Sequence, residues 1–127
     1  MMIASKDFQI NTVTYCNKYC GTNEEVVIPD GVTVIGKSAF ERNESIKSVS
    51  IPNTVIGIDP DAFRGCISLE KIVFSKKLEY IDESAFTYCR NLTDIELPES
   101  LKSTGAYAFW DCGLTRTRLP EKIPKIE

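Results

Sequence analysis

The stretch that decides the fold is residues 61–74, which reads DAFRGCISLEKIVF. Its alanine–phenylalanine pair recurs at a constant spacing of 23 residues, at Ala39-Phe40, Ala62-Phe63, Ala85-Phe86 and Ala108-Phe109. A fixed period of roughly 20–50 residues is the signature of a repeat architecture, in which each unit buries its apolar face against the next. The sequence therefore predicts a solenoid.

Each repeat is predicted to have three parts. The first is a short strand with two apolar core residues on either side of an outward-facing one, at 26–28, 49–51, 72–74, 95–97 and 117–119. Proline ends four of these strands because it donates no ladder hydrogen bond, and Ser75 replaces it in the third. The second part is a turn with two spaced apolar residues. These are Val32/Ile35, Val55/Ile58, Leu78/Ile81, Leu101/Thr104 and Ile123/Ile126.

The third part is predicted to be a short helical turn that holds the Ala-Phe pair. Asp59 is a good helix cap, and Pro60 suits the first helical position. Alanine is small where coils stack closely, and phenylalanine fills the space between the strand and the turn. Burial of the four phenylalanines is therefore expected to hold the coils together.

The chain is predicted to divide into an N-terminal cap, residues 1–22, and about four and a half coils, residues 23–127. A solenoid covers its first coil with an atypical segment, and one or two short strands are expected in this one. At the other end, Ile123 and Ile126 begin a further coil that stops before a new Ala-Phe turn. We therefore expect that the chain is truncated from a longer array or self-associates through its C-terminal coil.

Composition excludes several classes of function. The net charge of −3 gives no basic field for nucleic acid, and no apolar run approaches the ~20 residues that span a bilayer. The start has no basic segment followed by an apolar one, so no signal peptide is expected; the alternatives are a cytoplasmic protein and a piece of a longer chain. Histidine is absent, which removes the Ser-His-Asp and Cys-His nucleophile systems. No cofactor and no enzymatic activity are expected.

Cysteine occupies one repeat position in three coils, at Cys66, Cys89 and Cys112, and Asn43 occupies it in another. A small polar side chain here can bond the backbone of a tight corner. One cysteine per coil differs from the closely spaced pairs of zinc sites, so buried, reduced thiols are expected. Two further cysteines, Cys16 and Cys20, lie in the cap, where a disulfide remains an open alternative.

An acidic cluster is expected at one edge, where coil stacking brings the caps of two turns together. It consists of Asp59, Asp61, Asp82 and Glu83. A calcium site is one interpretation, because calcium takes several oxygen ligands. Helix capping already explains the aspartates, so no metal site is predicted.

The repeat resembles the BspA-like leucine-rich repeats of bacterial and protist surface proteins, with the pattern C-x-x-L-x-x-I-x-L-P-x-x-L-x-x-I-x-x-x-A-F. Cys66-x-x-Leu69-x-x-Ile72-x-Phe74 and Cys89-x-x-Leu92-x-x-Ile95-x-Leu97-Pro98 carry it, and the likeness spans residues 19–126. The resemblance implies an α/β leucine-rich-repeat solenoid with a parallel β-sheet on one face and short helical turns. It also implies a role in adhesion or protein binding at a cell surface or after secretion, without catalysis or an invariant binding residue.

The candidate ligand-binding residues face the open side of the predicted sheet. They are Ser48, Ser50, Lys71, Val73, Asp94, Glu96, Arg116 and Arg118. In a regular parallel sheet, Asp94 and Glu96 would lie between Lys71 and the two arginines. This pattern fits an ion-pair ladder between coils, worth ~0–1 kcal/mol per exposed pair, and it also fits a charged recognition stripe.

The sequence thus predicts a non-enzymatic, adhesion-type module that binds a protein partner on its open sheet face. A glycan ligand is the alternative for the same surface. A purely structural segment of a longer solenoid, with no ligand of its own, is the other alternative.

Overall fold

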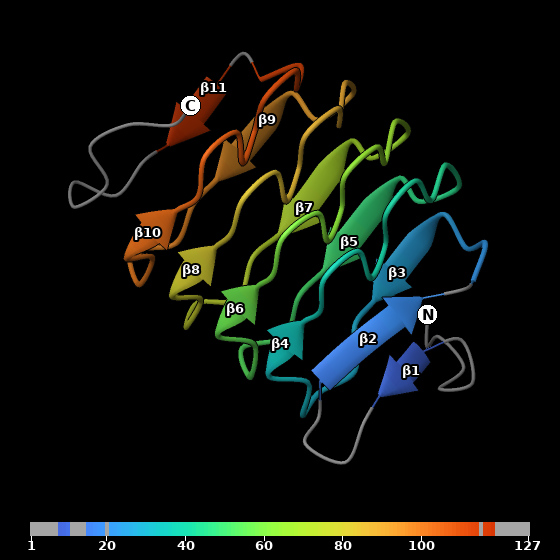
Figure 1. Ribbon diagram of the computed structural model, residues 1–127, viewed down its shortest axis with the longest axis vertical. Helices are drawn as coiled ribbons and strands as arrows, with labels where there is room; N and C mark the ends of the chain where they lie inside the picture. Colours follow the sequence, from blue (N-terminus) through green and yellow to red (C-terminus); the bar gives the residue numbers. More distant parts are fainter. Residues whose placement is uncertain (1–7, 11–14, 20, 115, 119–127) are drawn as a thin grey trace.

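The computed structural model describes residues 8–10, 15–19, 21–114 and 116–118. Within them the chain winds into successive coils, and the short strands of neighbouring coils line up in two layers (Figure 1). The coils stack from the N-terminal strands at one end of the molecule to β11 at the other. This arrangement is the predicted leucine-rich-repeat solenoid.

The first layer contains the strands predicted from the apolar triplets. They are β3 (Glu25–Val27), β5 (Ser48–Ser50), β7 (Lys71–Val73), β9 (Asp94–Glu96) and β11 (Arg116–Arg118). Each strand begins and ends one residue earlier than its triplet. The third residue of a triplet still joins the ladder, because the Ile28 N–H donates to the Ser50 carbonyl at 3.0 Å.

The layer is not one uninterrupted sheet. Backbone pairing joins β3 to β5 and β5 to β7, and it separately joins β9 to β11. In the part of the chain that the structure describes, no ladder pairing joins β7 to β9, although the two strands are neighbours. The parallel ladder that the sequence predicted through all coils is therefore interrupted between these two strands.

The second layer lies where the sequence predicted only turns. Its two-residue strands pair in parallel and are β4 (Val34–Ile35), β6 (Gly57–Ile58), β8 (Tyr80–Ile81) and β10 (Ser103–Thr104). The second residue of the first three strands is an isoleucine that is fully buried. The spaced apolar residues thus mark a second sheet rather than a simple turn.

The N-terminal segment joins this second sheet. The strand β1 (Phe8–Ile10) pairs antiparallel with β2 (Tyr15–Tyr19), and β2 pairs in parallel with β4. The expectation of one or two strands here is confirmed. Because β2 occupies the place of a second-layer strand, the segment resembles part of a coil, and the boundary at residue 22 stays a prediction.

The Ala-Phe segments are not helical, and no helix occurs among the described residues. In residues 59–66, alternate amides donate to carbonyls three residues back at 3.1 to 3.3 Å, whereas the Phe63 N–H donates to the Ala85 carbonyl of the next coil at 2.7 Å. This alternation requires left-handed backbone at Asp61 (φ 62°) and Gly65 (φ 74°). The predicted helical turns are wrong because these amides bond between coils instead of along a helix.

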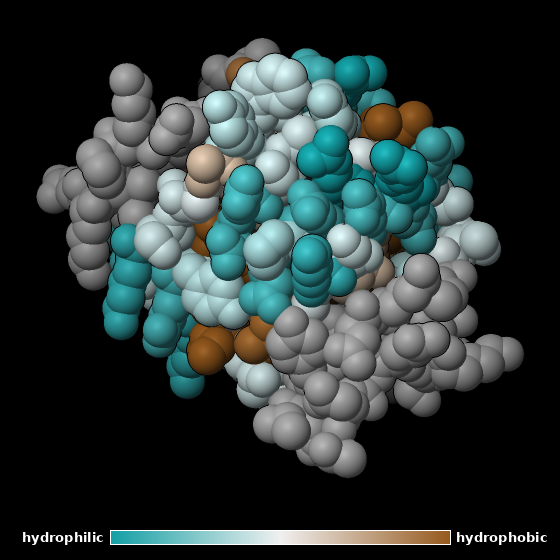
Figure 2. Space-filling model, in the orientation of Figure 1, coloured by the Kyte–Doolittle hydropathy of each residue, from teal (hydrophilic) through white to brown (hydrophobic). Residues whose placement is uncertain are grey.

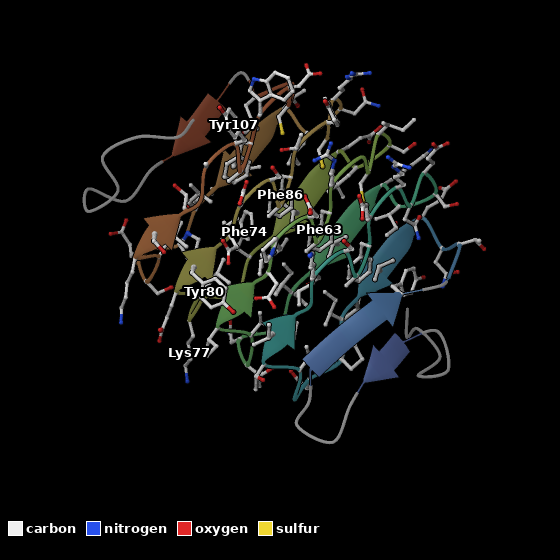
Figure 3. All side chains as sticks on the ribbon, viewed as in Figure 1. Phe63, Phe74, Lys77, Tyr80, Phe86 and Tyr107 are labelled. Atoms are coloured by element: carbon white, nitrogen blue, oxygen red, sulfur yellow. The ribbon has the colours of Figure 1, made fainter. Side chains whose placement is uncertain are left out.

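The phenylalanines of the pairs form a continuous stack through the core. Ring centroids are 4.8 Å apart for Phe40 and Phe63, 5.0 Å for Phe63 and Phe86, and 5.3 Å for Phe86 and Phe109. Tyr19 extends the stack at 5.1 Å from Phe40. All five rings are buried, which confirms the prediction, and each contributes ~1.5–3 kcal/mol by burial. Figure 3 labels Phe63 and Phe86 in this stack.

Candidate functional site

The predicted binding residues lie on the outer face of the first layer. Lys71, Val73, Asp94 and Glu96 are exposed, and Ser48 and Ser50 are partly exposed, while the middle residue of each strand is buried. Figure 2 shows the side of the molecule that faces the viewer in Figure 1, and hydrophilic side chains, in teal, cover much of that side too. Backbone pairing puts Ser48 beside Lys71 and Ser50 beside Val73. These four side chains therefore lie together on one face of the paired strands β5 and β7.

Arg116 and Arg118 pair through their backbones with Asp94 and Glu96, as the repeat predicted. The side chains of both arginines lie outside the described residues. The backbone ladder that would set Lys71 directly beside Asp94 is not formed, because β7 and β9 are not paired. Ion pairs between coils instead include Glu24 with Lys47, Glu79 with Lys102, and Arg90 with Asp111.

A cleft of ≈ 350 Å³ opens between β7 and β9, and this cleft was not predicted. Apolar groups of Ile72, Val73, Phe74, Leu97 and Pro98 line it together with Lys76, Glu96 and Glu99. A second hollow of ≈ 280 Å³ lies beside it on the same face, lined by Glu24, Glu25, Lys47, Ser48, Glu70 and Lys71. The open face is therefore grooved rather than flat.

The sequence carried a signal for the cleft in two departures from the repeat. Phe74 stands where other coils have isoleucine or leucine, and its ring meets the Phe86 ring edge-on at 5.9 Å (Figure 3). Ser75 replaces proline directly after it and is fully buried. The departures fall at the carboxyl end of β7, where the pairing with β9 is lost.

The three repeat cysteines are free thiols, and the predicted burial is confirmed for Cys66 and Cys89 but not for Cys112, which is only partly buried. Each thiol donates to a phenylalanine carbonyl of the preceding coil, with Sγ–O distances of 3.1 Å for Cys66, 3.1 Å for Cys89 and 3.0 Å for Cys112. Asn43 fills the same role through its side-chain amide, which donates to the Gly21 carbonyl at 3.0 Å. All three thiols are free, and the first two are buried.

The thiol pKa values follow from this placement. Burial raises the pKa of Cys66 to about 12. The interaction with the neighbouring Cys112 thiol, and then burial, raise the pKa of Cys89. Such thiols are poor nucleophiles and poor metal ligands, because both roles need the thiolate. The side chains of Cys16 and Cys20 lie outside the described residues.

The acidic edge does not assemble a cation site. Asp59 accepts a hydrogen bond from the Tyr80 hydroxyl at 2.8 Å, and Asp61 pairs with Arg64 at 3.7 Å. Asp82 accepts from the Glu83 N–H at 2.8 Å. No group of three or more metal-ligating side chains comes together in the described part of the chain.

A third hollow, which sequence analysis missed, lies over the Ala-Phe turns. Its volume is ≈ 340 Å³, and Arg64, Ser84, Thr87, Tyr88, Tyr107 and Trp110 line it. Tyr107 and Trp110 are large and exposed, at 54% and 49%. The signal was present in the sequence, since these aromatic residues fall at repeat positions that hold Ser84 and Thr87 one coil earlier.

The repeat pattern, the two layers and the buried aromatic stack agree with a family model described as a BspA type leucine rich repeat region. The model matches residues 10–127 in six copies. The chain belongs to the BspA-type leucine-rich repeat family. The match includes β2, in agreement with the position of this strand in the second layer.

Several solved structures are similar to this BspA-type protein. A T. pallidum leucine-rich repeat protein is 29% identical, with a TM-score of 0.76 over 94% of this chain and 72% of that one. A leucine-rich repeat protein of Bacteroides capillosus is 30% identical, with a TM-score of 0.76 over 87% and 91%. The pneumococcal vaccine antigen PcpA is 26% identical, with a TM-score of 0.68 over 88% of this chain and 32% of that one.

No curated protein matches the chain in sequence. Among the described residues, no helix has the length and apolar character needed to cross a membrane.

Proposed function

We propose that this BspA-type chain is an adhesion-type module that binds a protein partner on the open face of β3, β5, β7 and β9. Family membership supports the class, because leucine-rich repeat proteins typically bind proteins and are generally non-catalytic. The observation that carries the proposal is the grooved outer face, with the cleft between β7 and β9 at its centre.

The face has the composition of a recognition surface. Val73 is 55% exposed and Val27 is 48% exposed, so apolar anchors stand among charged side chains. The cleft places Lys76 within the same wall as Glu96 and Glu99, which gives it both signs of charge for choosing a partner. Binding would need little backbone ordering, because the ladder already fixes β3, β5 and β7.

The neighbours add a cellular context. PcpA is a vaccine antigen of a bacterium, and the other two structures come from bacteria. A role at a bacterial cell surface or after secretion follows as part of the proposal. The alternative of a purely structural segment predicts that no partner contacts the open face.

Site-specific photo-crosslinking tests the proposal. A benzophenone side chain at Ser50 samples the open face, and one at Lys102 samples the second layer as a matched control. A protein partner should crosslink at residue 50 and not at residue 102. The charge swap Lys71→Glu with Glu96→Lys should abolish this crosslink without changing the melting temperature. Equal crosslinking at both positions, or insensitivity to the swap, would contradict the proposal.

A further inference from the structure

The hollow over the Ala-Phe turns is built by a step in side-chain size between neighbouring coils; we refer to it as the aromatic hollow. Ser84 and Thr87 form its floor, and the next coil places Tyr107 and Trp110 at the same two repeat positions. The Tyr107 and Trp110 rings lie 6.2 Å apart and nearly perpendicular, at 79°. Two partly exposed rings therefore meet edge to face beside small, hydroxyl-bearing residues. Figure 3 labels Tyr107 near the end of the molecule that carries β9 and β11.

These aromatic residues are not required by the fold. Tyr88 and Tyr107 have left-handed backbones, with φ of 66° and 60°. One coil earlier, the position of Tyr88 holds Gly65 and the position of Tyr107 holds Ser84. Glycine suits this conformation, and a bulky ring is the less favourable choice at either position. Neither Tyr107 nor Trp110 is part of the buried core. Trp110 contacts the Tyr88 ring on the surface, with centroids 5.6 Å apart, and both Tyr107 and Trp110 keep about half of their surface exposed for a ligand.

The cations beside the hollow have different roles. The guanidinium groups of Arg64 and Arg90 lie 5.2 and 5.4 Å from the centre of the Tyr88 ring, so they fix this ring by cation–π contact. Arg90 is already paired with Asp111, since its Nε and Nη2 atoms donate to the Asp111 carboxylate at 3.2 and 3.0 Å. Arg64 touches Asp61 only at 3.7 Å, beyond hydrogen-bond distance, and it is the cation that lines the hollow.

We propose that the aromatic hollow binds a sugar ring that carries a carboxylate, as the end of an acidic glycan. The C–H faces of a pyranose are attracted to the negative faces of aromatic rings, and Trp110 and Tyr107 each leave about half of their surface exposed for such a contact. Arg64 presents the fork of N–H donors that matches a carboxylate, and no carboxylate is among the described residues that line the hollow. The hydroxyl of Ser84 is placed to meet those of the sugar.

The dimensions favour a sugar over a protein segment at this place. A volume of ≈ 340 Å³ lies at the small end of the ~300–1,000 Å³ usual for small-ligand sites. Polar groups and rigid rings alternate around it, which suits a ligand whose edges are hydroxyls and whose faces are C–H groups. This inference is independent of the protein-binding face, because the two sites lie on different sides of the coil and share no lining residue.

An array of immobilised glycans tests the proposal, with neutral, uronic-acid and sialic-acid ends as probes. The wild-type chain should be retained by carboxylate-bearing glycans and much less by their neutral counterparts. Trp110 is the only tryptophan of the chain, so its fluorescence should change saturably when the best-retained glycan is titrated in solution. Arg64→Gln should weaken this binding about tenfold or more, and Tyr107→Ala by a similar factor.

Two variants serve as controls. Ile56→Ala removes an exposed apolar side chain outside the hollow and should bind like the wild type. The open-face swap Lys71→Glu with Glu96→Lys should also bind normally, which separates this proposal from the preceding one. Retention of no glycan, retention of neutral glycans alone, or full retention by a folded Trp110→Ala variant would each overturn the inference.

Discussion

The turn after β7 contains two departures from the repeat that compensate for each other, and a double-mutant cycle can test this. In two coils, a hydroxyl two residues after the proline closes the turn against the preceding coil. Thr54 donates to the Val32 carbonyl at 2.8 Å, and Ser100 donates to the Leu78 carbonyl at 2.6 Å. The coil between them has Lys77 at this position.

Ser75 supplies the missing hydroxyl from the proline position. Its Oγ donates to the Val55 carbonyl at 2.7 Å and accepts from the Lys77 N–H at 3.0 Å. The bond to Val55 is buried. We infer that the hydroxyl has moved from residue 77 to residue 75, so that the carbonyl of the preceding coil keeps its partner.

Ser75→Pro should therefore destabilise the protein, although it restores the commoner residue of the repeat. Leaving the Val55 carbonyl without a partner costs ~1–3 kcal/mol, whereas a compatible proline stabilises by ~0.4–1 kcal/mol. The expected net loss is about 1–2 kcal/mol. The missing N–H of proline should add no further cost, because the Ser75 N–H donates no hydrogen bond within the described residues.

The double variant Ser75→Pro with Lys77→Thr should recover the loss, because the new threonine hydroxyl would reach the Val55 carbonyl as Thr54 reaches Val32. We expect its free energy of unfolding to equal or exceed that of the wild type. Lys77→Thr alone should change it by less than about 0.5 kcal/mol. Urea denaturation followed by circular dichroism measures the unfolding free energy of the wild type, the two single variants and the double variant. Ser100→Ala serves as a control, because it removes the equivalent hydrogen bond from the next coil. A coupling energy near zero would refute the compensation.

Three further predictions concern the core. Phe86→Ala should cost ~3–5 kcal/mol in a denaturant melt, since the Phe86 ring is fully buried against three aromatic rings, and a loss below about 1 kcal/mol would contradict the stacking. Burial in the folded state raises the pKa of Cys66 from 9.0 to about 12, so the free energy of unfolding should fall as the pH rises from 9 to 12. Cys66→Ala should make this fall smaller. Labelling of the Cys66 thiol in the native protein at pH 8 should be slow. Gly57→Ala should cost ~1–3 kcal/mol by the same melt, because an added Cβ would collide with the Tyr80 ring and displace its hydroxyl from Asp59; an unchanged midpoint would show that the ring moves freely.

The architecture could be predicted because its determinants repeat. A buried phenylalanine, a small alanine and an apolar strand at a fixed period leave one way to bury every coil against the next. The turns could not be predicted in the same way. A cap such as Asp59 followed by Pro60 favours a helix locally, but the inter-coil bond from Phe63 to Ala85 uses the amide that a helix would need. Tertiary bonding outweighed local propensity.

The positions of the candidate residues relative to one another could be predicted only where the repeat stays regular. Ser48, Ser50, Lys71 and Val73 lie where the period placed them, because β5 and β7 are paired. Asp94 is paired with Arg116 of β11, as predicted, but it is not paired with Lys71, because β7 and β9 form no ladder. That loss coincides with the packing of one larger ring, Phe74, which a period cannot convey.

We infer that the departures from the repeat are the positions at which this chain would recognise its own ligands. The side chains that every coil shares are buried between stacked coils, so they cannot contact a ligand. The cleft and the aromatic hollow both fall at departures. Phe74 and Ser75 accompany the cleft between β7 and β9, and Tyr107 and Trp110 replace small residues at the aromatic hollow.

If this reasoning is correct, the double variant Tyr107→Ser with Trp110→Thr, which installs the residue types of the preceding coil, should lose glycan retention. Its free energy of unfolding should stay unchanged or rise, because Tyr107→Ser removes a bulky ring from a left-handed backbone position and Trp110→Thr removes an exposed aromatic side chain. Glycan retention and a urea melt on the same preparation measure the two effects together. A large loss of stability in that variant would show that the two rings serve the fold, and the assignment of the hollow to a ligand would then fail.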